Sequence, residues 1–196
     1  GKILEWDGHV KRLERSLNEL DMKFPISETE LLDIHFDLIK KNTLKEGLIY
    51  LQVTRGEDDR SFDYPDESVK PTLVLFTQIK SLAESNIAKT GLKVISVPDM
   101  RWGRRDIKTV QLLAPSMCKM MAKKKNKDDA WMIQDGFITE GTSNNAYIIT
   151  KDNVLITRNL SNDILAGVTR RSILRYAKEA QILSLIHISE PTRLQD

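Results

Sequence analysis

Several kinds of residue are scarce in this chain of 196 residues. A single cysteine, Cys118, excludes an internal disulfide framework and any zinc site built from several cysteines. The three histidines, His9, His35 and His187, have no metal-ligand spacing with one another or with Cys118, so we predict no metal site. The net charge of +2 leaves no excess of one sign that would favour nucleic acid or an anionic membrane as partner.

Long apolar runs are missing as well. No segment approaches the roughly 20 apolar residues that a membrane helix needs, so we expect no membrane partner. The first residues, GKILEWDGHV, show neither a signal-peptide pattern nor an initiator methionine. We therefore expect a cytoplasmic protein, which also fits the single cysteine, and a chain that begins within a longer protein.

The first part of the chain alternates helical and strand patterns. Ser27 and Glu30 have the spacing of a capping box at the start of the second helix. The last strand is apolar enough to be buried on both faces. The predicted elements are helices over 6–20 and 24–42 and strands over 48–56 and 71–77. Together they predict a small α/β domain over residues 1–77.

Residues 78–90 have no clear strand pattern, and we expect them to link two domains. The following pattern predicts a second, larger domain over 91–182. Its predicted elements are a strand over 91–99, a helix from Thr109 to about Lys127, hairpins over 130–141 and 145–158, and a helix over 167–180. Asp135-Gly136 and Asp152-Asn153 are the turn signals of the two hairpins. Pro115 should end or kink its helix, whose apolar stripe would be Val110, Leu113, Met117 and Met121.

The end of the chain has a different character. The stretch LSLIHISEPTR matches the translation of a common sequencing adapter. We therefore expect residues 183–196 to be an artefactual tail, and the authentic sequence to stop near Ile182.

Lys108, in the stretch RRDIKT, is a candidate nucleophile. An amine reacts only when it is deprotonated, so a catalytic lysine needs burial or nearby cations that lower its pKa. Arg104 and Arg105 precede Lys108, and apolar residues such as Ile107 and Val110 surround it in sequence. The alternative is one more solvated lysine among many.

Two further stretches carry polar groups at the ends of predicted elements. Glu140, in TEGTSNN, follows directly on a strand and could pair with a protonated ring nitrogen; the alternative is a polar turn that closes a hairpin. Gly167, Val168 and Thr169 open a helix, where backbone N–H groups and a hydroxyl can hold a phosphate; the alternative is an ordinary glycine-opened helix.

A lysine-rich run over 119–127 supports two interpretations. It is typical of a solvated helix end, where cations complement the helix dipole. The other interpretation is a basic nucleic-acid-binding module, which would bind in a salt-sensitive manner. Aromatic residues do not interleave with these lysines, as such modules require.

Five motifs, taken together and in order, resemble the fold-type IV aminotransferases that use pyridoxal 5′-phosphate. They are GHVKRLERS, IYLQVTRG, RWGRRDIKTVQLL, TEGTSNNAY and ILAGVTR, and they run from about Asp7 to Ala180. Within the family, the D-amino-acid aminotransferases are the most similar. The resemblance implies an α/β (α+β) fragment, in which a small α/β domain precedes part of a larger β-barrel-like domain with helices. The family's domains extend upstream of Gly1 and beyond Ile182.

The resemblance also implies roles around the cofactor ring. Lys108 matches the lysine that forms the Schiff base with pyridoxal phosphate. Glu140 matches the acid that pairs with the pyridine nitrogen, and Leu165 matches the residue that packs against one face of the ring.

Phosphate and substrate contacts follow in the same way. Arg12, Val168 and Thr169 match phosphate ligands, and Arg60 matches the arginine that holds the substrate carboxylate in D-specific members. Those members often have Arg-x-His at this place, whereas Phe62 stands here instead of the histidine. Only half of that carboxylate site is therefore present.

The implied activity is a ping-pong transamination between an amino acid, with a D-amino acid such as D-alanine favoured, and a 2-keto acid. Lys108 would act as general base and acid once the substrate has displaced it. The alternatives within the fold are a branched-chain amino-acid aminotransferase and an aminodeoxychorismate lyase. Members of the family are usually homodimers, so we expect a homodimer of the full-length protein.

Overall fold

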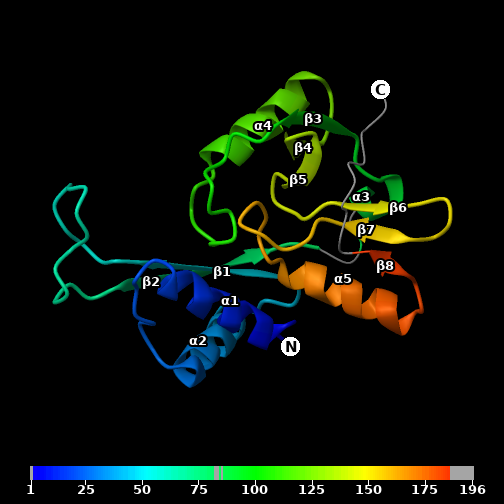
Figure 1. Ribbon diagram of the computed structural model, residues 1–196. Coiled ribbons are helices and arrows are strands. Elements are labelled where there is room, and N and C mark those ends of the chain that lie inside the picture. Colours follow the sequence, from blue (N-terminus) through cyan, green and yellow to red (C-terminus); the bar gives the residue numbers. More distant parts are fainter. Residues whose placement is uncertain (1, 82–83, 85, 186–196) are drawn as a thin grey trace. The chain divides into compact units, whose positions relative to one another are not determined.

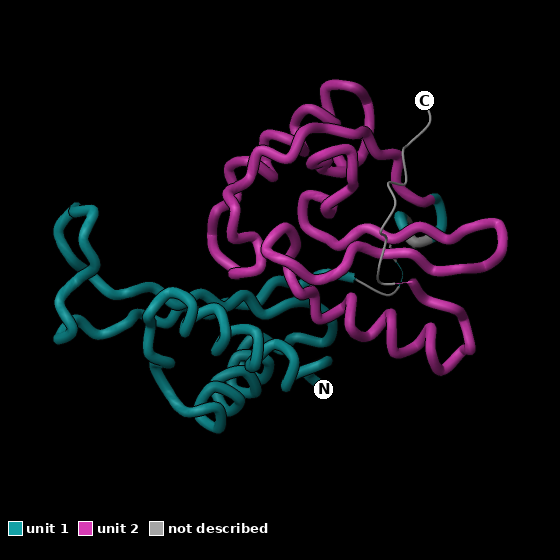
Figure 2. Tube along the Cα trace, viewed as in Figure 1, with its two compact units in different colours: residues 1–90 teal, residues 91–196 magenta. Residues whose placement is uncertain are grey.

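The structure is a computed structural model that describes residues 2–81, 84 and 86–185. The chain divides into two compact units, residues 1–90 and residues 91–196 (Figure 2). Each unit is described by itself.

Unit 1 combines helices with a two-stranded antiparallel sheet (Figure 1). Its elements are α1 (Trp6–Asn18), α2 (Glu28–Lys41), β1 (Gly47–Thr54), β2 (Thr72–Ile79) and α3 (Asn86–Thr90). Tyr50 and Phe76 lie opposite each other in the β1–β2 pair, and their rings stack at 4.8 Å between centroids. Because α2 packs against β2, one side of the sheet is covered.

The helices α1 and α2 confirm the two helical predictions. Ser27 Oγ accepts from the Glu30 N–H at 3.2 Å, while Glu30 Oε2 accepts from the Ser27 N–H at 2.9 Å, so the capping box is complete. Trp6 joins the two helices: its indole N–H donates to Glu28 at 3.0 Å, and its ring meets His35 edge-on at 5.0 Å. Leu31, on α2, is only 1% exposed and belongs to the buried core of this unit.

The prediction that the strand over 71–77 is buried on both faces is wrong. Val74 and Phe76 are each 43% exposed, whereas Leu73, Leu75 and Thr77 are half-buried. A sheet of two strands with helices on one side can bury only alternate side chains. The strand also runs longer than predicted, through Ile79, and α3 occupies the end of the expected 78–90 linker.

Unit 2 is built on two three-stranded sheets. Its elements are β3 (Val94–Pro98), α4 (Leu113–Lys124), β4 (Asp129–Gln134), β5 (Phe137–Gly141), β6 (Tyr147–Ile149), β7 (Leu155–Thr157), α5 (Val168–Glu179) and β8 (Ser184–Leu185). The strand orders are β3-β4-β5 and β6-β7-β8. Helix α4 packs against β3 and β4, and α5 packs against β8.

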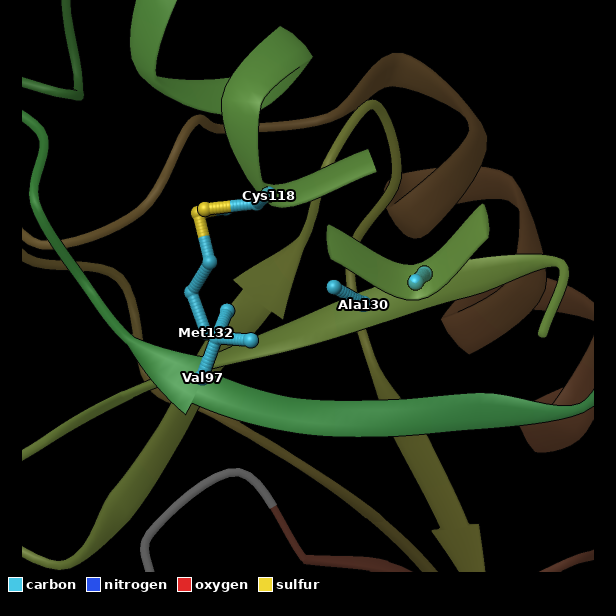
Figure 3. Packing of buried hydrophobic residues seen from close by; sticks show 5 residues of the cluster. Val97, Cys118, Ala130 and Met132 are labelled. Atoms are coloured by element: carbon cyan, nitrogen blue, oxygen red, sulfur yellow. The ribbon is translucent and has the colours of Figure 1, made fainter. Parts of the chain in front are cut away.

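A small core lies between α4 and the β3–β4 sheet. Val97, Cys118, Ala122, Ala130 and Met132 form this cluster. Figure 3 shows the Met132 side chain extending toward Cys118. Both residues are completely buried, and burial raises the pKa of the Cys118 thiol. The cysteine therefore serves here as a small apolar residue.

The β4–β5 hairpin is confirmed, including its turn. Asp135 and Gly136 both have positive φ, 53° and 81°, as a type I′ turn requires. The second hairpin differs from the prediction, because only Asn153 has positive φ (59°), and the loop spans Thr150 to Val154. Asn153 N–H donates to Thr150 C=O at 3.0 Å, which describes a longer turn followed by a left-handed residue.

Helix α4 starts later than predicted and buries a different face. It begins at Leu113, so Pro115 lies in its first turn, where the missing N–H has no intrahelical partner to lose. The predicted stripe is exposed, with Leu113 75% and Met117 50% accessible. The residues that face the sheet are Cys118 and Ala122, because their small side chains allow the helix to approach closely. The lysine-rich run falls at the end of α4, as its helix-end interpretation predicted.

The last predicted helix is confirmed as α5, with Gly167 as its N-cap. Two residues of the expected artefactual tail, Ser184 and Leu185, form β8, which pairs in parallel with β7. Residues 186–196, the rest of that tail, lie outside the described residues. Among the residues that the structure describes, no helix has the length and apolar character to cross a membrane.

Candidate active site

Glu140 lies at the end of β5 and is 5% exposed. Arg101 Nη1 donates to its Oε1. The other carboxylate oxygen, Oε2, accepts from Asn145 Nδ2 at 3.0 Å and from the Leu165 N–H at 3.3 Å. The carboxylate is therefore held from three sides, by the segment after β3, by the turn after β5 and by the segment before α5.

Arg101 also binds Asp99, which directly follows β3. Its Nε donates to Asp99 Oδ1 at 2.9 Å and its Nη2 to Oδ2 at 2.7 Å, the fork geometry of a two-point ion pair. Thr139 Oγ1 donates to Asp99 Oδ2 at 2.6 Å. Burial alone would raise the pKa of Asp99, but these hydrogen bonds and the Arg101 charge outweigh it and hold the pKa at about 2.

Glu140 differs from Asp99 in its titration. Burial raises the pKa of Glu140 above its ordinary value, although the hydrogen bond and charge of Arg101 oppose this. A carboxylate offers about four lone-pair positions, and Arg101, Asn145 and Leu165 take three of them. One position remains on the buried carboxylate, so Glu140 can accept one further hydrogen bond, such as that of a ring N–H.

Lys108 follows a buried turn. Arg105, Asp106 and Ile107 are buried, and the Arg105 N–H donates to the Asn162 carbonyl at 2.9 Å. Lys108 itself is exposed. Of its apolar neighbours in sequence, Ile107 is buried and Val110 is 59% exposed, so they do not cover the Lys108 side chain.

The neighbouring cations are also engaged. Arg104 binds Asp106, and Arg105 donates to Gln134 at 2.6 Å with Asp99 3.7 Å away. Nearby acids therefore partly compensate the charges of Arg104 and Arg105, which weakens the effect of these cations on Lys108.

The start of α5 offers backbone donors. The N-cap residue, Gly167, has no side chain and so makes no side-chain cap hydrogen bond to this helix. The first N–H groups of a helix have no intrahelical partner and favour an anion. Val168, the first residue of the helix, is buried, and Thr169, the second, is exposed. The half-buried Leu165 precedes them and links this segment to Glu140.

Arg12 and Arg60 belong to unit 1. Arg12 is half-buried on α1, with His9 Nδ1 3.4 Å from its Nη2, and burial lowers the pKa of its guanidinium. Among the described residues, no carboxylate lies within ion-pair distance of Arg12, so this guanidinium can take an external anion. Arg60 lies in the exposed loop between β1 and β2, where Phe62 is 96% exposed.

The structure thus joins Glu140, Asn145 and Leu165, three positions before α5, through hydrogen bonds within unit 2. It adds two residues that the sequence prediction missed, Arg101 and Asn145. Both lie inside stretches that had drawn attention, RWGRRDIKT and TEGTSNN. Arg101 is 39 positions from Glu140, so no local spacing indicated the pairing.

The fold is mixed α/β. Unit 2 offers an acceptor, Glu140, that suits a ring N–H, and backbone donors at the start of α5 that suit an anionic group. The Amino-transferase class IV family matches residues 1–193, and the chain belongs to this family. Over 182 residues it is 35% identical to the D-alanine aminotransferase of Staphylococcus aureus (strain MSSA476). That match covers 93% of this chain and 64% of the relative, so the chain spans less than two thirds of the relative's length.

Solved structures share the fold. A candidate 4-amino-4-deoxychorismate lyase from Legionella pneumophila matches with a TM-score of 0.81 at 23% identity, over 95% of this chain and 68% of the other. A branched-chain amino acid aminotransferase from Thermobaculum terrenum, in its PLP-form, matches with a TM-score of 0.78 at 17% identity, over 96% of this chain and 62% of the other. At these identities the likeness establishes the fold alone.

Proposed function

We propose that the chain is part of a pyridoxal-phosphate-dependent aminotransferase that transfers an amino group between an amino acid and a 2-keto acid. The observation that carries this proposal is Glu140, a buried carboxylate at a strand end with one lone-pair position left. Membership of the class IV family supports the same reaction. A D-amino acid such as D-alanine is the favoured substrate, in line with the 35% identity to a D-alanine aminotransferase.

The residues present fit the cofactor. Glu140 would accept a hydrogen bond from the ring N–H, and Leu165 would pack against the ring. The α5 N–H groups and the Thr169 hydroxyl would bind the phosphate. Arg12, in unit 1, is proposed as a further phosphate ligand on the family resemblance alone. When bound, pyridoxal phosphate supplies a sink for the electrons released at the substrate Cα.

The work of the chain's own residues is binding, orientation and proton transfer. A deprotonated Lys108 Nζ would bind the cofactor and later take up the proton from the substrate Cα as general base. Glu140 would keep the ring nitrogen protonated, and the Arg101 contact favours the charged form of that carboxylate. Arg60 would bind the substrate carboxylate through its guanidinium.

The first experiment locates the lysine. We expect borohydride treatment of the chain with pyridoxal 5′-phosphate to attach the cofactor to Lys108, as peptide mass spectrometry would show. Lys108→Ala should abolish this attachment, and Lys123→Ala, an exposed lysine at the end of α4, should leave it unchanged. Attachment that persists at another lysine in Lys108→Ala would exclude the assignment.

The second arm of the same experiment concerns the substrate. Initial rates of keto-acid-dependent turnover with D-alanine and with L-leucine should favour D-alanine. Phe62 stands in place of the histidine of D-specific members, so only half of their substrate-carboxylate site is present. Faster turnover of L-leucine would indicate the branched-chain alternative. Pyruvate release that needs no keto-acid acceptor would instead indicate the lyase. A homodimer is part of the proposal for the full-length protein.

A further inference from the structure

Asn145 connects three parts of the candidate site through one side-chain amide. It lies in the segment between β5 and β6 and is half-buried. Its Nδ2 donates to Glu140 Oε2 at 3.0 Å and to the Leu165 carbonyl at 3.0 Å. Both neighbours are acceptors, so only the nitrogen of the amide can face them. Each of its two N–H groups therefore has a partner.

The other end of the same amide faces the start of α5. A Cβ added to Gly167 would lie 2.1 Å from Asn145 Oδ1. Gly167 has φ −65°, which any residue adopts, so glycine is needed here for space and not for backbone freedom. The amide thus occupies the place of a side chain at the N-cap of α5.

We propose that Asn145 is a positioning residue for the reaction, which holds the Glu140 carboxylate and the 165–167 segment in one fixed arrangement. This inference rests on the proposed function, because Glu140 would bind the cofactor ring and α5 its phosphate. With Oε2 fixed by Asn145 and Leu165, the remaining lone-pair position of the carboxylate lies on Oε1, beside Arg101. Loss of the amide would remove one of the three contacts that fix the carboxylate in this orientation and would leave Oε2 with the Leu165 N–H alone.

The adjacent residue provides a matched control. Asn144 is exposed, and its Nδ2 donates to Asp129 Oδ2 at 3.2 Å, away from Glu140. Its backbone carbonyl accepts from the Gly141 N–H at 2.7 Å, a contact that alanine preserves. Replacing Asn144 therefore removes an asparagine amide from the same segment without touching the carboxylate.

The test compares Asn145→Ala and Asn145→Asp with Asn144→Ala in the full chain. Pyridoxal 5′-phosphate is the probe, and its dissociation constant is measured by absorbance titration. We expect the constant to rise about tenfold or more in Asn145→Ala, and further in Asn145→Asp, which places a second negative charge beside Glu140. Asn144→Ala should stay within about twofold of the parent chain.

A second readout needs no cofactor. The Glu140 carboxyl is titrated by ¹³C NMR in the parent chain and in the variants. A lost donor disfavours the charged carboxylate, so the Glu140 pKa should rise in Asn145→Ala and stay unchanged in Asn144→Ala. A merely structural effect, spread over the unit, would not single out this carboxyl.

The outcomes separate the two proposals. If the parent chain shows no Lys108-dependent binding of pyridoxal phosphate, the proposed function fails, and the Glu140 titration still decides whether Asn145 positions the acid. Equal effects of Asn145→Ala and Asn144→Ala on both readouts would overturn the inference. If Asn145→Ala does not fold, Gly167→Ala decides, because its methyl group displaces the same amide. Unchanged binding and an unchanged Glu140 titration in Gly167→Ala would overturn the inference too.

Discussion

Arg101 lies between two acidic side chains that are almost completely buried. Its own side chain is 12% exposed, and those of Asp99 and Glu140 are 0% and 7% exposed. Burial alone would lower the pKa of Arg101, but hydrogen bonds and charge from both acids raise it. Arg101 therefore compensates both carboxylates, and Arg105, 3.7 Å from Asp99, adds a second cation beside that acid.

We predict that Arg101→Met destabilises unit 2 severely. Removing one partner of a buried pair leaves an uncompensated charge and costs about 3–5 kcal/mol. Here Glu140 and Asp99 would both lose their contact with Arg101, although Arg105 would remain 3.7 Å from Asp99. Urea unfolding followed by circular dichroism measures the change. Arg175→Met is the control, because the Arg175–Glu179 pair is exposed on α5, and such pairs contribute less than about 1 kcal/mol. Equal midpoints for the two variants would contradict the prediction.

The sequence indicated some residues of the site and missed others for a physical reason. Glu140 could be singled out because its motif is contiguous and follows directly on a strand. Arg101 acts on Glu140, 39 positions away, and Asn145 joins Glu140, in its own motif, to Leu165, 20 positions away. Their contacts arise only once β3, β5 and the segment before α5 come together, which no local spacing encodes.

Features of helices and strands could likewise be predicted only where they depend on neighbouring residues in the sequence. The start of α2 was predictable because a capping box joins residues three positions apart. The buried face of α4 was not, since Met117 and Met121 have the same spacing as Cys118 and Ala122, one position further on. Close packing against β3 and β4 favoured the smaller pair, and that preference depends on the tertiary structure. The burial of β2 likewise depends on how many strands and helices surround it.

At the scale of one element, we predict that Ser27→Ala weakens α2. The variant loses the acceptor for the Glu30 N–H and the donor at 2.7 Å to Glu30 Oε2. The loss of such a cap costs about 1 kcal/mol in the free energy of unfolding. Thermal melts of unit 1 signals, such as Trp6 fluorescence, would report it.

Thr29→Ala is the matched control for the cap. Thr29 is exposed in the first turn of the same helix, and alanine has the higher helix propensity. We expect no loss, or a small gain, in stability. A melting temperature lowered equally by both substitutions would show that helix composition, and not the cap, determines the effect.

At the scale of the whole molecule, acid stability depends on which carboxyl groups the fold perturbs. The pKa of Asp99 is lowered from 3.8 to about 2. A lowered pKa means that this group stabilises the fold above pH 3.8 and loses that contribution as the pH falls toward 2. Glu140 has the opposite sign: its raised pKa gives a contribution present at low pH and lost as the pH rises through that pKa. The two acids therefore act in different pH ranges.

We predict that Asp99→Asn flattens the acid limb of the stability curve. Between pH 4 and 2 the parent chain should lose about 1–2 kcal/mol more than the variant. Urea unfolding at a series of pH values measures the difference. Asp66→Asn is the control, because Asp66 also has a lowered pKa but lies in the exposed loop before β2. Parallel curves for the parent and Asp99→Asn would mean that the Arg101 and Thr139 contacts do not stabilise the charged form of Asp99.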